Sequence, residues 1–159
     1  MARESKKVSN LVIEHAKVLF RNFTGREEKF NPAGKRNFCV VIDQDTAAKL
    51  RSDGWNVKRL QAREEGDEDT NYIQVSVSYA NFPPKIYIVT SKGKKTLLDE
   101  DSVGQLDYAE IVNVDVIISP YYWEVSGKSG IKGYVKNMYV TIQEDVFADK
   151  YSDDDDFPF

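Results

Sequence analysis

Residues 73–79 alternate strictly between apolar and polar side chains, and this pattern constrains the fold more than any other feature of the chain. The apolar members are Ile73, Val75, Val77 and Tyr79, and the polar members are Gln74, Ser76 and Ser78. Successive side chains of a β-strand point to opposite faces, so the pattern predicts a strand with one buried and one solvated face. We therefore expect a sheet that packs a core against one side.

Strand patterns recur along most of the chain. We expect strands over residues 10–21, 37–43, 56–62 and 72–79, a hairpin over 85–98, and a long hairpin of 110–123 and 131–143 around the loop 126–130. A short helix over 46–51 begins at Asp43 or Asp45 and ends at Gly54, and residues 101–109 add one or two helical turns. This order predicts an all-β or β-rich α+β fold, either a small barrel or a sandwich.

Aromatic residues are interleaved with basic residues on the expected hairpins and loops. Single-stranded nucleic acid requires this combination, because flat rings stack on unpaired bases while cations follow the phosphates. Normal barrel cores also contain aromatics, so core packing stays open for each ring. The predicted DNA-binding residues are Arg21, Lys29, Lys35, Arg36, Lys85, Tyr87, Lys92, Lys94, Lys95, Tyr121, Tyr122, Trp123, Lys128, Lys132, Tyr134 and Lys136; Phe23, Arg26 and Phe30 lie in the same loop as Lys29.

Strand alternation predicts the exposed face for one of these tyrosines and leaves the face of another open. Tyr87 shares a face with Lys85, opposite Ile86 and Ile88, so it is expected to be exposed. Tyr134 has the parity of Lys132 and Lys136, and equally that of Met138 and Val140. The face of Tyr134 is therefore left open by the sequence.

The last residues form an acidic run followed by an apolar tip. Asp153, Asp154, Asp155 and Asp156 precede Phe157, Pro158 and Phe159. Four adjacent ionised carboxylates are too costly to bury, so the segment is expected to be solvated and disordered. The aromatic tip and an α-carboxylate suit a basic-rimmed apolar pocket of a partner. A plain solubilising tail is the alternative.

The charge is unevenly distributed. Residues 146–159 carry five acids and one base, so the remaining 21 acids and 21 bases cancel and the tail carries the whole net charge of -4. A neutral body can still contain a basic groove. One Cys and one His are too few for a structural zinc site, and we expect Cys39 to be a core residue, His15 to be structural, and no cofactor, metal or membrane span. No motif indicates an enzyme.

The tail resembles the C-terminus of bacterial single-stranded DNA-binding proteins. With the strand AKVLFRNFTG and the lysine-rich hairpin, the whole chain resembles phage-encoded proteins of this function. The resemblance implies an OB-fold-like five-stranded barrel with extra hairpins, and non-specific coating of single-stranded DNA in phage replication and recombination in the cytoplasm of the bacterial host. It also implies recruitment of a polymerase or primase-helicase through the tail, in which Asp153–Asp156 match the family's acidic run and Phe159 its terminal aromatic.

Three regions are expected: a flexible N-terminal segment over 1–9, a DNA-binding domain over 10–146, and a disordered tail over 147–159. Charge competition between the tail and DNA, and formation of a homodimer, are further hypotheses. Two other functions remain open at this stage. One is a β-rich interaction protein or virion component with a docking tail, and the other is a DNA-processing enzyme with a carboxylate-bound metal.

Overall fold

Six strands form a small barrel in the computed structural model, which describes residues 9–80, 83–90 and 92–143. Strands β2 (Val18–Asn22), β3 (Arg36–Ile42) and β5 (Thr70–Val77) pair antiparallel, and β5 pairs parallel with β9 (Lys128–Ile142). Strand β9 pairs with β8 (Ile111–Val125), and β8 pairs with β1 (Leu11–Ile13). The predicted flexible N-terminal segment 1–9 and the predicted tail 147–159 lie outside the described residues, apart from Ser9.

The barrel closes within the N-terminal segment. The Ala16 backbone N–H donates to the Val114 carbonyl of β8, and the Lys17 carbonyl accepts from Val41 N–H of β3. Adjacent residues thus connect the two ends of the sheet. The prediction of one continuous strand over 10–21 was wrong, because the backbone bends at His15, which has a φ of 54°. Asp115 Oδ1 accepts from His15 N–H at 3.0 Å, and Asn113 Oδ1 lies 2.7 Å from His15 Nδ1.

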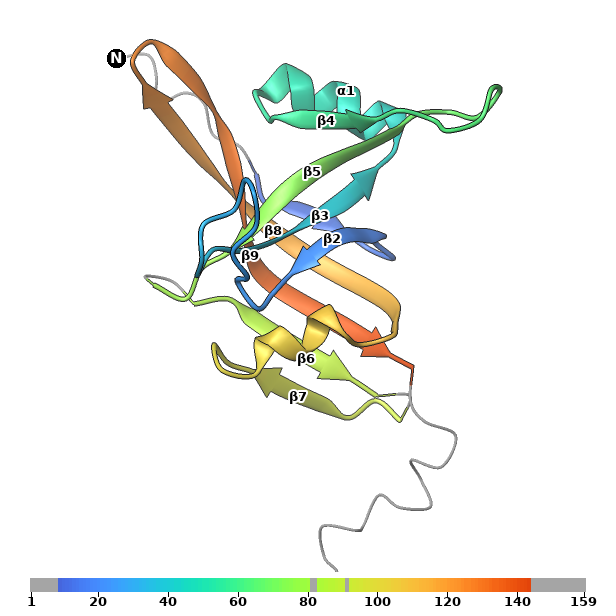
Figure 1. Cartoon of the computed structure of the whole chain (residues 1–159), viewed down its shortest axis with the longest axis vertical. Coiled ribbons are helices and arrows are strands. Elements are labelled where there is room, and N and C mark those ends of the chain that lie inside the picture. Colours follow the sequence, from blue (N-terminus) through green and yellow to red (C-terminus); the bar gives the residue numbers. More distant parts are fainter. Residues whose placement is uncertain (1–8, 81–82, 91, 144–159) are drawn as a thin grey trace, which may run out of the picture.

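The long hairpin of β8 and β9 extends well beyond the barrel. We call residues 119–132 the arm, and Figure 1 shows it rising beside the unit that contains α1 and β4. A five-residue loop over 126–130 was expected, but the strands continue to a two-residue turn of Ser126 and Gly127. Both residues have positive φ, at 51° and 81°. This is the geometry of a type I′ turn, whose twist matches that of the flanking strands.

A β-bulge at Lys136 reverses the alternation of β9. Ile117 pairs with Asn137 and Ile118 pairs with Val135, which leaves Lys136 as the extra residue. Val135 and Met138 are consequently both buried. The open question of Tyr134 is answered by this bulge, because Tyr134 faces outward with Lys132 while Met138 and Val140 face the core.

The remaining elements decorate the barrel. Helix α1 (Gln44–Asp53) begins at Asp43, whose side chain accepts from Thr46 N–H, and ends at Gly54 with a φ of 110°. Strand β4 (Val57–Leu60) pairs with β5, and the hairpin of β6 (Lys85–Val89) and β7 (Lys95–Leu98) extends the sheet beside β9. The 3₁₀ helix η2 (Val103–Asp107) provides the turns expected over 101–109.

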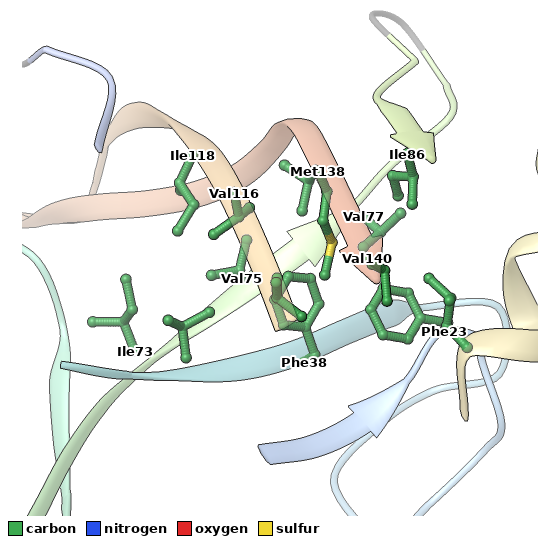
Figure 2. Close-up of a cluster of buried hydrophobic side chains, with 14 of the residues drawn as sticks. Phe23, Phe38, Ile73, Val75, Val77, Ile86, Val116, Ile118, Met138 and Val140 are labelled. Carbon is green, nitrogen blue, oxygen red and sulfur yellow. The ribbon is translucent and has the colours of Figure 1, made fainter. Parts of the chain in front are cut away.

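The core fills the barrel interior, as the alternating patterns predicted. Ile73, Val75 and Val77 of β5 are buried against the inward residues of β3, β8 and β9 (Figure 2). Phe23 and Phe38 stack with ring centroids 5.0 Å apart. Burial of these rings and aliphatic side chains stabilises the barrel by roughly 1.5–3 kcal/mol per side chain. Among the described residues, no helix is both long and apolar enough to span a membrane.

Candidate nucleic-acid interface

A groove of about 360 Å³ lies beside the arm. Three parts of the chain enclose it: residues of β3 and β5, the loop 23–35, and the arm together with residues 55–56 after α1. It is lined by Phe30, Asn31, Pro32, Lys35, Asn37, Trp55, Asn56, Ile73, Gln74, Ser76, Trp123, Ile131 and Lys132.

Two aromatic side chains reach the groove from different elements. Phe30 of the loop is 90% exposed and Trp123 of the arm is 36% exposed. Lys29 Nζ lies 5.4 Å from the Phe30 ring centroid, and Lys35 and Lys132 complete the basic lining. The exposed Phe30 ring contributes little burial energy to the fold. The ring face is therefore available to stack on a ligand.

The loop 23–35 is held by a network of hydrogen bonds. Asn31 Nδ2 donates to the carbonyls of Arg26, Pro32 and Lys35, and the buried Asn22 Oδ1 accepts from the N–H groups of Gly25 and Arg26. Glu28 and Asn31 also exchange two backbone hydrogen bonds. Phe30 is therefore presented by an ordered turn, which lowers the entropic cost of binding.

Asp107 attaches this loop to η2. Its carboxylate accepts from the N–H groups of Phe23 and Thr24 and from the Thr24 hydroxyl, at 2.6–3.0 Å. Arg26 Nη1 lies 3.6 Å from the same carboxylate, whose side chain is almost completely buried. The pKa of Arg26 is raised, first by a hydrogen bond with Tyr108 and then by Asp107. Arg26 is thus a structural cation.

Two glycines of β9 allow the tryptophans to lie against the strand. A Cβ built on Gly130 would lie 3.0 Å from Trp123 Cζ2, so the indole crosses the backbone of its cross-strand partner. A Cβ on Gly133 would lie 2.8 Å from Trp55 Cζ3. Trp123 packs at the edge of the groove and Trp55 is buried at its base.

A second aromatic pair lies on the outward face of the same sheet, and neither of its residues is among the predicted DNA-binding residues. Phe20 and Tyr72 meet edge to face with centroids 5.7 Å apart. Phe20 is 59% exposed and has a φ of 52°, within the bulge between Leu19 and Asn22. The parity of Tyr72 with Gln74 and Ser76 was the available signal, whereas the bulge that exposes Phe20 has no clear sequence mark.

Cys39 is part of this outward face but is covered by its neighbours. It pairs with Leu19 on one side and Gln74 on the other, and it is buried as expected. Burial raises the pKa of the thiol to about 11, although the charge of Lys58 acts in the opposite direction. The thiol is therefore protonated at neutral pH and adds no negative charge near the groove.

The predicted DNA-binding residues fall into separate groups. Lys35, Trp123 and Lys132 line the groove, and Lys29 lies over the ring of Phe30. Tyr121, Tyr122 and Lys128 are exposed on the arm, where Tyr121 meets Tyr134 edge to face. Lys85, Tyr87, Lys92, Lys94 and Lys95 belong to the β6–β7 hairpin, at the far end of the barrel from the arm in Figure 1.

Arg21 and Arg36 make contacts within the protein. Arg21 Nη1 donates to the carbonyls of Leu106 and Ala109 at 2.7 and 2.8 Å, beside a second hollow. Arg36 lies 5.8 Å from the Tyr79 ring and donates to the Glu100 carbonyl. Burial raises the pKa of Tyr79 to about 12, so its phenol is neutral there. Neither arginine lines the groove.

Among residues 9–80, 83–90 and 92–143, no three His, Cys, Asp or Glu side chains are grouped so that they could hold a metal ion. The groove instead offers aromatic rings, amides, hydroxyls and lysines. These groups suit an unpaired polyanionic strand.

Comparison with protein-family models assigns the chain to a family. Residues 1–158 match the family model described as "Putative phage ssDNA-binding domain". The chain belongs to this family. A comparison with curated protein sequences finds no match.

Solved structures show the same fold. The chain is similar to the single-stranded DNA-binding protein from bacteriophage Enc34 in complex with ssDNA, with 8% identity, a TM-score of 0.54, and 86% of this chain and 88% of that chain covered. A second structure of the Enc34 protein has 9% identity, a TM-score of 0.51 and 89% of each chain covered. The predicted β-rich, OB-fold-like architecture is therefore confirmed.

Proposed function

We propose that this chain binds single-stranded DNA in the groove, with bases stacked on Phe30 and Trp123 and phosphates near Lys35 and Lys132. The observation that carries the proposal is the convergence of two exposed rings and basic side chains, from separate elements, on one groove. Membership of the phage family supports it. Binding is without sequence preference because stacking accepts every base, and the chain acts as a coating protein rather than an enzyme.

Oligo(dT) is expected to bind with strong salt dependence and to be preferred over a blunt duplex. Stacking needs base faces that a duplex hides. The change in intrinsic fluorescence of Trp123 and Trp55 measures binding at about 50 and about 200 mM salt. The affinity should be weaker at the higher concentration, because the release of counterions from DNA is then less favourable. Equal affinity for duplex and single strand in a competition assay would contradict the proposal.

The acidic segment 153–156 is proposed to compete with DNA for this groove, and Phe159 to recruit a polymerase or primase-helicase during phage replication and recombination in the host cytoplasm. The charge division between body and tail supports the first part. The aromatic tip supports the second. Association into a homodimer is a separate hypothesis, and sedimentation velocity would measure it.

Deletion of residues 152–159 is expected to tighten oligo(dT) binding, most clearly at low salt, where screening of the carboxylates is weakest. Phe159→Ala is the matched control, because it retains the four aspartates and should leave DNA affinity unchanged while abolishing capture of the replication protein. Unchanged affinity after the deletion at low salt would remove the competition hypothesis. Capture that survives Phe159→Ala would remove the docking hypothesis.

A further inference from the structure

The outward face of β9 carries alternating cations and aromatics along most of its length. We call this set, together with its neighbours on β6 and β7, the β9 track. Its members are Lys132, Tyr134, Lys136 and Tyr139 from β9, Lys85 and Tyr87 from β6, and Lys95 from β7. The track begins in the groove, because Lys132 is one of the groove residues.

The bulge at Lys136 makes the track continuous. Tyr134 and Tyr139 are five positions apart, so strict alternation would place them on opposite faces. The extra residue restores the outward direction of Tyr139, which pairs with Tyr87 of β6, while Met138 remains in the core. The bulge therefore aligns two aromatic positions that the sequence spacing separates.

Each half of the track combines a lysine with tyrosine rings. In the half near the groove, Lys132 Nζ lies 5.2 Å from the Tyr134 centroid. In the far half, Tyr87 and Tyr139 stack with centroids 5.1 Å apart and an interplanar angle of 7°. Lys95 Nζ lies 5.2 and 5.7 Å from these two centroids.

A carboxylate also lies on the far half of the track. Asp115 pairs with Tyr139 across β8 and β9, and its Oδ1 accepts the backbone N–H of His15 at 3.0 Å. The four lysines of the track supply the positive charge that a polyanion requires.

We propose that single-stranded DNA leaving the groove continues along the β9 track to the Tyr87–Tyr139 pair. The inference rests on the proposed function of the groove and names the path of the strand beyond it. The seven residue steps from Lys132 to Tyr139 span about 24 Å along a strand. This length adds room for further nucleotides, within the range of about 4–16 nucleotides per OB-fold.

Oligonucleotides of two lengths distinguish binding in the groove from binding along the track. Oligo(dT) of about 6 nucleotides occupies the groove alone, and oligo(dT) of about 20 nucleotides reaches both. The test variant carries Lys95→Gln and Lys136→Gln, which keep a polar side chain shorter by one atom and remove two exposed charges. The matched control carries Lys17→Gln and Lys49→Gln, which remove two exposed charges from the segment before β2 and from α1.

The track variant is expected to bind the long oligonucleotide about tenfold more weakly, with the slope of log affinity against log salt reduced by about 1.4. Its affinity for the short oligonucleotide should match that of the unmodified chain, and the control should retain its affinity for both. An unchanged long-oligonucleotide affinity, or an equal loss for both lengths, would overturn the track. If the unmodified chain binds neither length, the proposed function of the groove itself fails.

Discussion

Replacing Phe30 and Trp123 together by Ala is expected to weaken oligo(dT) binding by roughly 30-fold or more. A stacked base contributes about 1–3 kcal/mol by alanine substitution, and each ring is placed to stack one base. Phe30 is 90% exposed, so its removal should change the free energy of unfolding little, whereas removal of Trp123, which is 36% exposed, also removes its packing against Gly130. Fluorescence anisotropy of a labelled oligonucleotide measures the affinity without relying on the tryptophan that is removed.

Val112→Ala is the control for this pair. Val112 is 60% exposed, and it lines the second hollow of about 510 Å³ beside Arg21 rather than the groove. Its truncation should leave the affinity unchanged. The groove assignment would be refuted if the Phe30 and Trp123 variant bound as tightly as the unmodified chain, or if Val112→Ala caused an equal loss.

Gly133→Ala is expected to destabilise the fold by about 1–3 kcal/mol, because the added Cβ overpacks the core. That atom would lie 2.8 Å from both Ile118 Cγ2 and Trp55 Cζ3. Ile118 is completely buried and Trp55 nearly so, which leaves neither side chain room to move away. Urea unfolding followed by circular dichroism measures the free energy.

Gly130→Ala adds the same methyl group three residues closer to the tip of the arm. Its Cβ would lie 3.0 Å from Trp123 Cζ2, but that indole is at the surface and can move outward. We expect a smaller loss of stability than for Gly133→Ala. Equal stability losses for the two variants would show that Gly133 is not specially constrained.

The interior of the barrel follows directly from local patterns. Alternation around Ile73 and in the strand containing Phe38 gave the buried faces, and the cap at Asp43 with the stop at Gly54 gave the helix. These signals are local because burial depends on the direction of each side chain, and that direction follows from strand or helix geometry.

Irregular backbone limited the prediction elsewhere. The bend at His15 splits an apparently continuous strand, and the bulge at Lys136 reverses the face of every residue after it. A one-residue shift exchanges the two faces of a strand, so the side to which Tyr139 points could not be obtained by counting from Tyr134. Partner strands set these irregularities.

The sequence by itself determined which residue types this protein offers to a ligand and how its core strands alternate. Lysines, aromatics and apolar strand faces are properties of single segments. Only the tertiary structure decided that Phe30 and Trp123, 93 positions apart, line one groove, while Arg21 bonds to carbonyls beside another hollow. The physical reason is that closure of the barrel and projection of the arm depend on long-range strand pairing, which places distant loops together without any local sequence mark.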